Sequence, residues 1–140
     1  MLPITAGHNP PSDSLILIVD DEPSNVDVIA HFLTMEGYRV AKAADGEEAL
    51  EQANLVRPDL LLVDVMMPRI NGYEVCRRLK ADPETRHIPV VLVSVKFFEG
   101  DKRAALNAGA AGYVVKPIHE GELLDAIRKA NVAAGEAGGI

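Results

Sequence analysis

The amino-acid sequence predicts an α/β fold: a doubly wound (βα)5 domain built on a parallel five-stranded sheet with strand order 2-1-3-4-5. Two observations lead to this prediction. Short apolar runs recur along the chain without the polar alternation of half-exposed strands, which is typical of strands buried on both faces. Between the runs, apolar residues recur with the spacing of amphipathic helices, so strands and helices alternate.

Four of the predicted strands are continuous runs rich in Leu, Ile and Val. They span residues 15–19, 60–63, 90–93 and 113–115. The segment 38–43 differs because polar and apolar residues interleave in it, and Arg39 and Lys42 face away from some of their apolar neighbours. This polar segment is predicted to be an edge strand, because the edge of a sheet tolerates charged side chains.

The predicted helices lie between these strands. Apolar residues at i, i+3, i+4 and i+7 mark the first helix, which is expected to stop at Gly37: Val26, Ile29, Ala30 and Leu33. Asp45 and Glu48 have the spacing of a capping box and open a helix that is expected to reach about Leu55. The first spacing recurs once more, at Gly72, Val75, Cys76 and Leu79. Two further helices are expected over residues 99–108 and 120–132.

This alternation requires right-handed crossovers and a parallel sheet with helices on both faces. The flavodoxin-like order 2-1-3-4-5 places the polar segment 38–43 at an edge and the apolar runs 15–19 and 60–63 inside. In such sheets, ligands bind beyond the carboxyl ends of the strands, where the strand order reverses. The residues that follow each strand are therefore the candidate functional residues.

Length and charge exclude several classes of protein. The chain has 140 residues, and 14 Lys and Arg against 21 Asp and Glu give a formal net charge of −7, which argues against nucleic acid or an anionic membrane as the partner. A single Cys76 predicts no disulfide framework, and no apolar run approaches a membrane span of about 20 residues. The start of the chain lacks an export signal, so a cytoplasmic location is expected.

The chain is expected to form one domain with short extensions. Pro and Gly in residues 1–13 suggest a flexible leader, residues 14–132 form the predicted domain, and residues 133–140 suggest a flexible tail or the start of a linker.

Polar residues suited to phosphate and metal chemistry follow four predicted strands: Asp20 and Asp21, Asp64, Ser94, and Lys116. Alone, each has an ordinary explanation, such as a helix cap, a turn residue or a solvated lysine. The predicted fold brings all five to one edge, where three carboxylates would repel one another unless a cation lay among them. Carboxylate oxygens suit Mg²⁺, and Asp64 is the best candidate for a nucleophile.

These residues form motifs that resemble the receiver domain of two-component response regulators. The motifs are Ile18-Val19-Asp20-Asp21-Glu22-Pro23, Leu62-Val63-Asp64-Val65-Met66-Met67-Pro68 with Asn71-Gly72, Val93-Ser94, and Tyr113-Val114-Val115-Lys116-Pro117. The resemblance covers about residues 15–130. It implies a phospho-accepting signalling domain that promotes only its own phosphorylation and dephosphorylation, not an enzyme acting on other substrates.

The resemblance also implies roles for individual residues. Asp64 would take a phosphoryl group from a histidine kinase or phosphotransfer protein. Asp21 and Asp64 would bind Mg²⁺ directly, Asp20 would bind it through water, and the backbone carbonyl of Met66 would complete the protein ligands. A cis peptide between Lys116 and Pro117 would direct Lys116 towards the acceptor.

The resemblance further implies a switch. Phosphorylation would draw Ser94 towards the phosphate and let Tyr113 turn inward, changing the face formed by residues 99–108, 113–115 and 120–132. That face would bind an output partner whose identity the sequence does not specify, or a second copy in a phosphorylation-dependent homodimer.

The residue after the switch hydroxyl departs from the family pattern. Val95 stands where the family usually has Ala or Gly. A β-branched side chain there is expected to narrow access to the phosphate, which would slow phosphorylation by small donors, hydrolysis, or both.

Three alternative functions fit the sequence less well. A Mg²⁺-dependent aspartyl-phosphatase-type enzyme would need a general acid two residues after its nucleophile, but Met66 stands at that distance from Asp64. A dinucleotide-binding domain would need a Gly-x-Gly-x-x-Gly motif after the first strand, and the sequence there does not fit it. A receiver-like interaction module that takes no phosphate is disfavoured because all five site positions hold competent residues.

Overall fold

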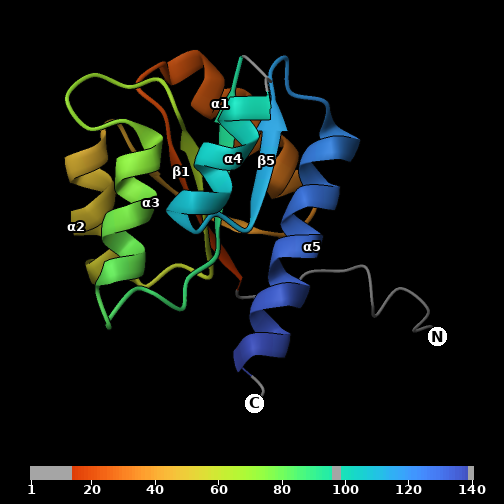
Figure 1. Cartoon of the computed structure of the whole chain (residues 1–140). Helices are drawn as coiled ribbons and strands as arrows, with labels where there is room; N and C mark the ends of the chain where they lie inside the picture. Colours follow the sequence, from red (N-terminus) through yellow and green to blue (C-terminus); the bar gives the residue numbers. More distant parts are fainter. Residues whose placement is uncertain (1–13, 96–98, 139–140) are drawn as a thin grey trace.

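The computed structural model describes residues 14–95 and 99–138, which form one sheet flanked by helices (Figure 1). The strands are β1 (Leu15–Val19), β2 (Arg39–Ala43), β3 (Leu60–Asp64), β4 (Val90–Ser94) and β5 (Gly112–Val115). The helices are α1 (Pro23–Met35), α2 (Gly46–Val56), α3 (Gly72–Ala81), α4 (Glu99–Ala108) and α5 (Glu120–Gly138). The leader predicted over residues 1–13 lies outside the described residues, so it stays a prediction.

The sheet has the predicted topology. Its strands lie in the order β2-β1-β3-β4-β5, and every neighbouring pair is parallel. The polar strand β2 is an edge strand as expected, with exposed side chains at Arg39 and Lys42. The register places Val19 beside Val63 and Asp64 beside Val93. The carboxyl ends of the central strands therefore meet at one edge of the sheet.

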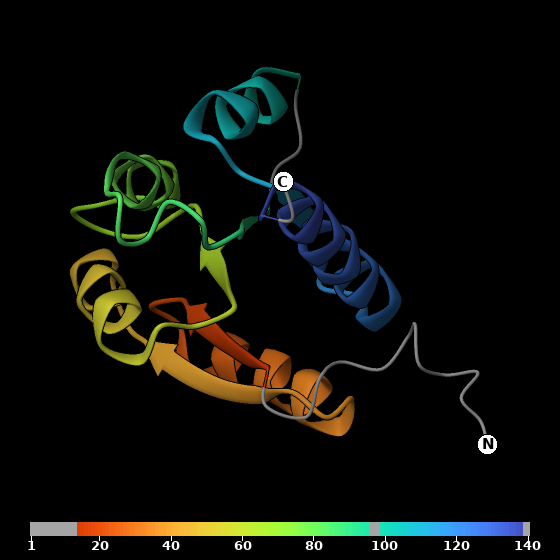
Figure 2. The ribbon, with the colours of Figure 1, turned by 90° about the horizontal axis from the view of Figure 1, so that it is seen from below.

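Helices cover both faces of the sheet, which explains the continuous apolar runs. In Figure 2, α1 and α5 lie on one side of the strands, and α2, α3 and α4 lie on the other. Along β1, Ile16 and Ile18 join the core under α1 and α5, whereas Leu17 and Val19 join the core under the other three helices. Because both faces are buried, neither set of alternate positions in β1 can be polar.

Local capping agrees with the sequence, with one shift. The Asp45 side chain accepts a hydrogen bond from the Glu48 N–H at 2.8 Å, as a capping box requires. The reciprocal bond goes to a different residue from the one expected, because Glu48 Oε1 accepts from the N–H of Ala44 at 2.8 Å. At the end of α1, Gly37 has a φ of 98°, the left-handed conformation that ends many helices.

The last helix is longer than predicted. The expected end at Val132 is wrong, because α5 continues to Gly138. Alanine and glycine dominate residues 133–138, and their sequence suggested fraying, yet the helix is already nucleated and docked through Leu123, Ile127 and Ala130. Among the described residues, none of the helices has both the length and the apolar character needed to cross a membrane.

Candidate functional site

Three carboxylates gather where β1 and β3 end. In Figure 1 these strands end at the upper edge of the sheet. Asp20 and Asp21 follow β1, and Asp64 is the last residue of β3. Each offers a carboxylate oxygen that lies within 4.8 Å of the other two. Asp20 and Asp64 are only 4% and 6% exposed, whereas Asp21 is open to solvent. The predicted meeting of these three side chains is therefore confirmed.

Lys116 lies between the two buried carboxylates. Its Nζ atom is 3.4 Å from Asp20 Oδ2 and 3.6 Å from Asp64 Oδ1, and its side chain is largely buried. Its backbone N–H donates to the carbonyl of Ser94 at 2.7 Å, which fixes the end of β5 against the end of β4. The peptide bond between Lys116 and Pro117 is cis, as the resemblance implied.

Backbone groups also orient the carboxylates. Asp20 Oδ1 accepts the N–H of Glu22 at 2.9 Å, which ties this side chain to the first residues after β1. Asp64 Oδ1 accepts the N–H of Met66 at 3.4 Å, a long bond that places the Met66 backbone beside Asp64. The Met66 side chain is 68% exposed, so this residue contributes its main chain to the site.

Burial and charge raise the pKa of Asp64. Desolvation makes the largest contribution and the negative charge of Asp20 adds to it, while Lys116 and the Met66 N–H oppose it, so the pKa rises to about 6. Three carboxylates against one ammonium leave negative charge in excess. A divalent cation would offset that excess, and three carboxylates from adjacent strand ends are oxygen donors of the kind that suit Mg²⁺.

The two predicted switch residues lie on the neighbouring strands. Ser94 ends β4, is buried, and pairs with Val115 of β5. Tyr113 is partly buried in β5, where it pairs with Leu92 and packs against the core under α2, α3 and α4. Ser94 is thus at the carboxylate edge, while Tyr113 lies further down the sheet, three positions before Lys116 in the chain.

Gly72 has a close contact with the Asp64 backbone that the sequence did not reveal. A Cβ atom on Gly72 would lie 2.6 Å from the Asp64 carbonyl oxygen and 2.8 Å from Val65 Cα. The start of α3 therefore touches the backbone of Asp64 and Val65. The sequence placed Gly72 on the inward face of a helix and in a motif with Asn71, and the only signal of close approach was that the residue is glycine.

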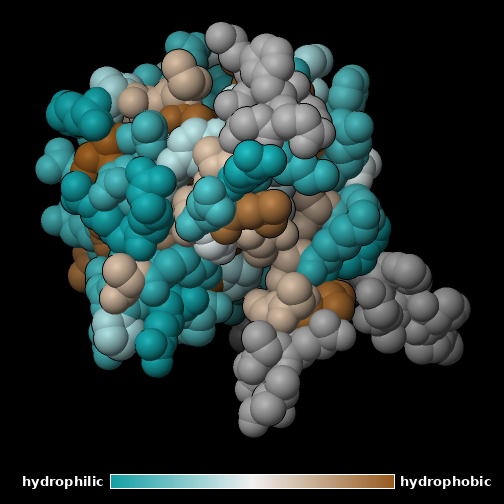
Figure 3. All heavy atoms as spheres, viewed as in Figure 1, coloured by the Kyte–Doolittle hydropathy of each residue, from teal (hydrophilic) through white to brown (hydrophobic). Residues whose placement is uncertain are grey.

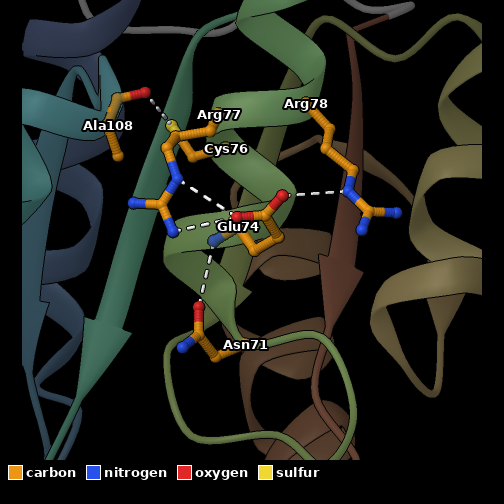
Figure 4. Close-up of polar contacts among 6 residues, drawn as sticks. All are labelled: Asn71, Glu74, Cys76, Arg77, Arg78 and Ala108. Carbon is orange, nitrogen blue, oxygen red and sulfur yellow. Dashed lines mark hydrogen bonds and ion pairs between the residues drawn. The ribbon is translucent and has the colours of Figure 1, made fainter.

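Two arginines on α3, Arg77 and Arg78, form ion pairs within their own helix. In Figure 4, Glu74 lies between Arg77 and Arg78, with ion pairs of 2.9 and 3.0 Å, and the Asn71 side chain accepts the Glu74 N–H. The Cys76 thiol donates to the carbonyl of Ala108 in α4 at 3.2 Å. Burial raises the pKa of Cys76 to about 11, so the thiol is a packing group rather than a reactive thiolate.

Comparison with known proteins agrees with this geometry. The family model of the response regulator receiver domain matches residues 16–128. The response regulator PleD of Caulobacter vibrioides is 46% identical over 113 residues, which are 81% of this chain and 25% of PleD. Protein PilH of Pseudomonas aeruginosa is 39% identical over 112 residues, which are 80% of this chain and 93% of PilH.

A solved structure gives the same fold with a metal in place. The receiver domain of the sensor histidine kinase PA1611 from Pseudomonas aeruginosa, which has a magnesium ion coordinated in its active-site cleft, matches with a TM-score of 0.78 and 32% identity over 86% of this chain and 98% of that one. The acidic cluster of Asp20, Asp21 and Asp64 is consistent with a magnesium site of this kind. The chain thus spans a quarter of PleD but nearly all of PilH, and it belongs to the response regulator receiver domain family of two-component signalling systems.

Proposed function

We propose that Asp64 is the phospho-acceptor of this receiver domain and takes a phosphoryl group from a histidine kinase or phosphotransfer protein. The observation that carries the proposal is the position of Asp64: its carboxylate is buried, lies beside two further carboxylates and contacts Lys116 at 3.6 Å. A carboxylate oxygen of Asp64 would form a bond to phosphorus while the phosphorus–nitrogen bond of the donor breaks. The departing imidazole nitrogen keeps that electron pair and accepts a proton.

The other site residues would bind and orient the reacting groups. The carboxylates of Asp21 and Asp64 and the carbonyl of Met66 are proposed to hold Mg²⁺ directly, with Asp20 acting through water. When bound, Mg²⁺ supplies positive charge against the phosphoryl oxygens. The Lys116 ammonium, which now lies between two carboxylates, would move onto a phosphoryl oxygen, and the Ser94 hydroxyl would donate a hydrogen bond to another.

The output is proposed to arise at the face of α4, β5 and α5. Ser94 and Tyr113 lie on adjacent strands that lead from the acceptor to this face, so a shift of both residues would change it. Figure 3 shows that this side of the molecule is mostly hydrophilic, with a hydrophobic area at α4, where Leu106 is 66% exposed. An output partner or a second copy of the chain would dock on this face.

The cytoplasmic location expected from the sequence stays a prediction.

Incubation with acetyl phosphate and Mg²⁺, followed by intact-mass measurement, tests the acceptor. We expect wild type to gain one phosphoryl group and Asp64→Asn to gain none, because an amide cannot attack phosphorus. Asp125→Asn, which removes a carboxylate on α5, is the control and should label like wild type. Labelling of Asp64→Asn, or loss of labelling in Asp125→Asn alone, would contradict the proposal.

Val95 is proposed to limit access to the acceptor. Val95 follows Ser94 directly and is 60% exposed, so it lies on the surface next to the end of β4. Val95→Ala is expected to raise the rate of labelling by acetyl phosphate, the rate of phosphate loss, or both, by about two- to fivefold, which corresponds to about 0.4 to 1 kcal/mol in the barrier. Equal rates for Val95→Ala and wild type in both assays would contradict the proposal that Val95 limits access to Asp64.

A further inference from the structure

The loop that joins β3 to α3, residues 65–71, carries the Met66 backbone next to the acceptor. Its first part is held by packing, because Val65 and Met67 are buried in the core while Met66 between them is exposed. Its end is held by α3, where Asn71 caps the helix (Figure 4) and Gly72 touches the Asp64 backbone. The middle of the loop, at Arg69 and Ile70, is anchored to the start of α2.

The start of α2 supplies that anchor through charge. Arg69 Nη2 is 2.9 Å from Asp45 Oδ2, and Arg69 Nε is 3.6 Å from Glu47 Oε1. The two carboxylate oxygens of Asp45 have different partners, because Oδ1 caps α2 at the N–H of Glu48 while Oδ2 accepts from Arg69. One side chain therefore joins the first turn of α2 to loop 65–71.

Close packing adds to the charge contacts. A Cβ atom on Gly46 would lie 2.9 Å from Ile70 Cβ and 3.0 Å from the Ile70 carbonyl oxygen, so α2 begins in direct contact with the loop. Arg69 itself has a φ of 68°, in the left-handed region that non-glycine residues seldom occupy. An arginine held in that conformation while its side chain bridges two carboxylates indicates that tertiary contacts fix the loop at this residue.

We propose that Arg69 is a positioning residue whose ion pairs with Asp45 and Glu47 hold loop 65–71 against α2 and so keep the Met66 backbone in place beside Asp64. The inference rests on the proposed function, because the loop would position the Met66 backbone for the Mg²⁺ site proposed there. Arg69 touches neither the metal nor the phosphoryl group in this scheme. It acts through the main chain that runs from residue 69 back to residue 66.

Calorimetric titration of the whole chain with Mg²⁺ at pH 8, without any phosphodonor, tests the inference. Arg69→Gln is expected to weaken Mg²⁺ binding by about two- to fivefold. The effect is small because a solvent-exposed ion pair has a small energy and because Arg69 acts only through the main chain of the loop. Arg69→Lys keeps the charge and should recover part of the loss.

The chain contains a matched control. Arg57 is also in the left-handed conformation, with a φ of 50°, and also forms an exposed ion pair, at 3.1 Å with Glu84, but it lies after α2 at the opposite end of that helix. Arg57→Gln should lower the melting temperature about as much as Arg69→Gln and leave the Mg²⁺ affinity unchanged. Equal Mg²⁺ affinities for the two glutamine variants would overturn the inference.

Amide NMR spectra of the metal-free variants separate this inference from the proposed function. Arg69→Gln should shift the amide signals of residues 65–71, and Arg57→Gln should not. If wild type takes up no phosphate while the Mg²⁺ and NMR effects of Arg69→Gln persist, the acceptor proposal fails and the positioning role stands. If wild type takes up phosphate while Arg69→Gln leaves both the affinity and the loop signals unchanged, the positioning role fails alone.

Discussion

Gly72→Ala is expected to lower the free energy of unfolding by about 2 to 3 kcal/mol, as overpacking of a closely fitted site does. The added Cβ would meet the Asp64 carbonyl oxygen at 2.6 Å and Val65 Cα at 2.8 Å, distances that folded proteins do not tolerate. Both atoms are backbone, so relief requires α3 or the end of β3 to move. Urea denaturation at pH 8 measures the stability loss, and Mg²⁺ titration measures the accompanying disturbance of the site.

Gly121 provides the control for this substitution. It lies in the first turn of α5, and a Cβ placed there meets nothing within 4 Å. Gly121→Ala is therefore expected to raise the free energy of unfolding by up to about 1 kcal/mol, because alanine favours the helix. A Gly72→Ala protein as stable as wild type would show that the contact between α3 and the Asp64 backbone is dispensable.

Asp64→Asn is expected to stabilise the metal-free protein at pH 8, although it removes the proposed acceptor. The pKa of Asp64 is about 6, raised first by burial and then by Asp20, so the charged carboxylate destabilises the folded state at neutral pH. The gain is expected to be about 1 to 2 kcal/mol after allowance for solvent screening at the open side of the site. Urea denaturation in EDTA measures it.

The pH dependence of this gain has a defined sign. Because the pKa of Asp64 is raised from its ordinary value of 3.8, the folded protein holds a proton that the unfolded chain releases between about pH 4 and pH 6. The cost of the charge is thus fully present above about pH 6 and disappears as the pH falls towards 4. The difference in the free energy of unfolding between Asp64→Asn and wild type should therefore shrink as the pH falls from about 6 to about 4.

Asp125→Asn is not expected to raise the free energy of unfolding as Asp64→Asn does. Hydrogen bonds from Lys129 and Arg128 lower the pKa of Asp125, so its charged form is favoured in the folded protein. The substitution should be neutral or slightly destabilising at pH 8. If Asp64→Asn destabilises the metal-free protein at pH 8, the contacts of Asp64 with the Lys116 ammonium outweigh its burial and its repulsion by Asp20.

The sequence alone determined the fold and the identity of the charged cluster. Runs such as 15–19 and 60–63 encode burial on both faces directly, because every residue in them is apolar. Parallel strands point the same way, so residues that follow them must meet at one edge. The order of the strands and of the residues that follow them therefore suffices to predict that Asp20, Asp21 and Asp64 lie together.

Only the tertiary structure decided how that cluster is supported. The contact of Gly72 with the Asp64 backbone, the sharing of Lys116 between two carboxylates, and the bridge from Arg69 to α2 all join residues far apart in the chain. The end of α5 beyond Val132 also depends on the rest of the structure. Its residues show no clear helical pattern of apolar side chains, and they continue a helix that is docked through earlier residues. Hydrophobic pattern and strand order are properties of segments, whereas these features depend on packing distances between segments, which no local pattern encodes.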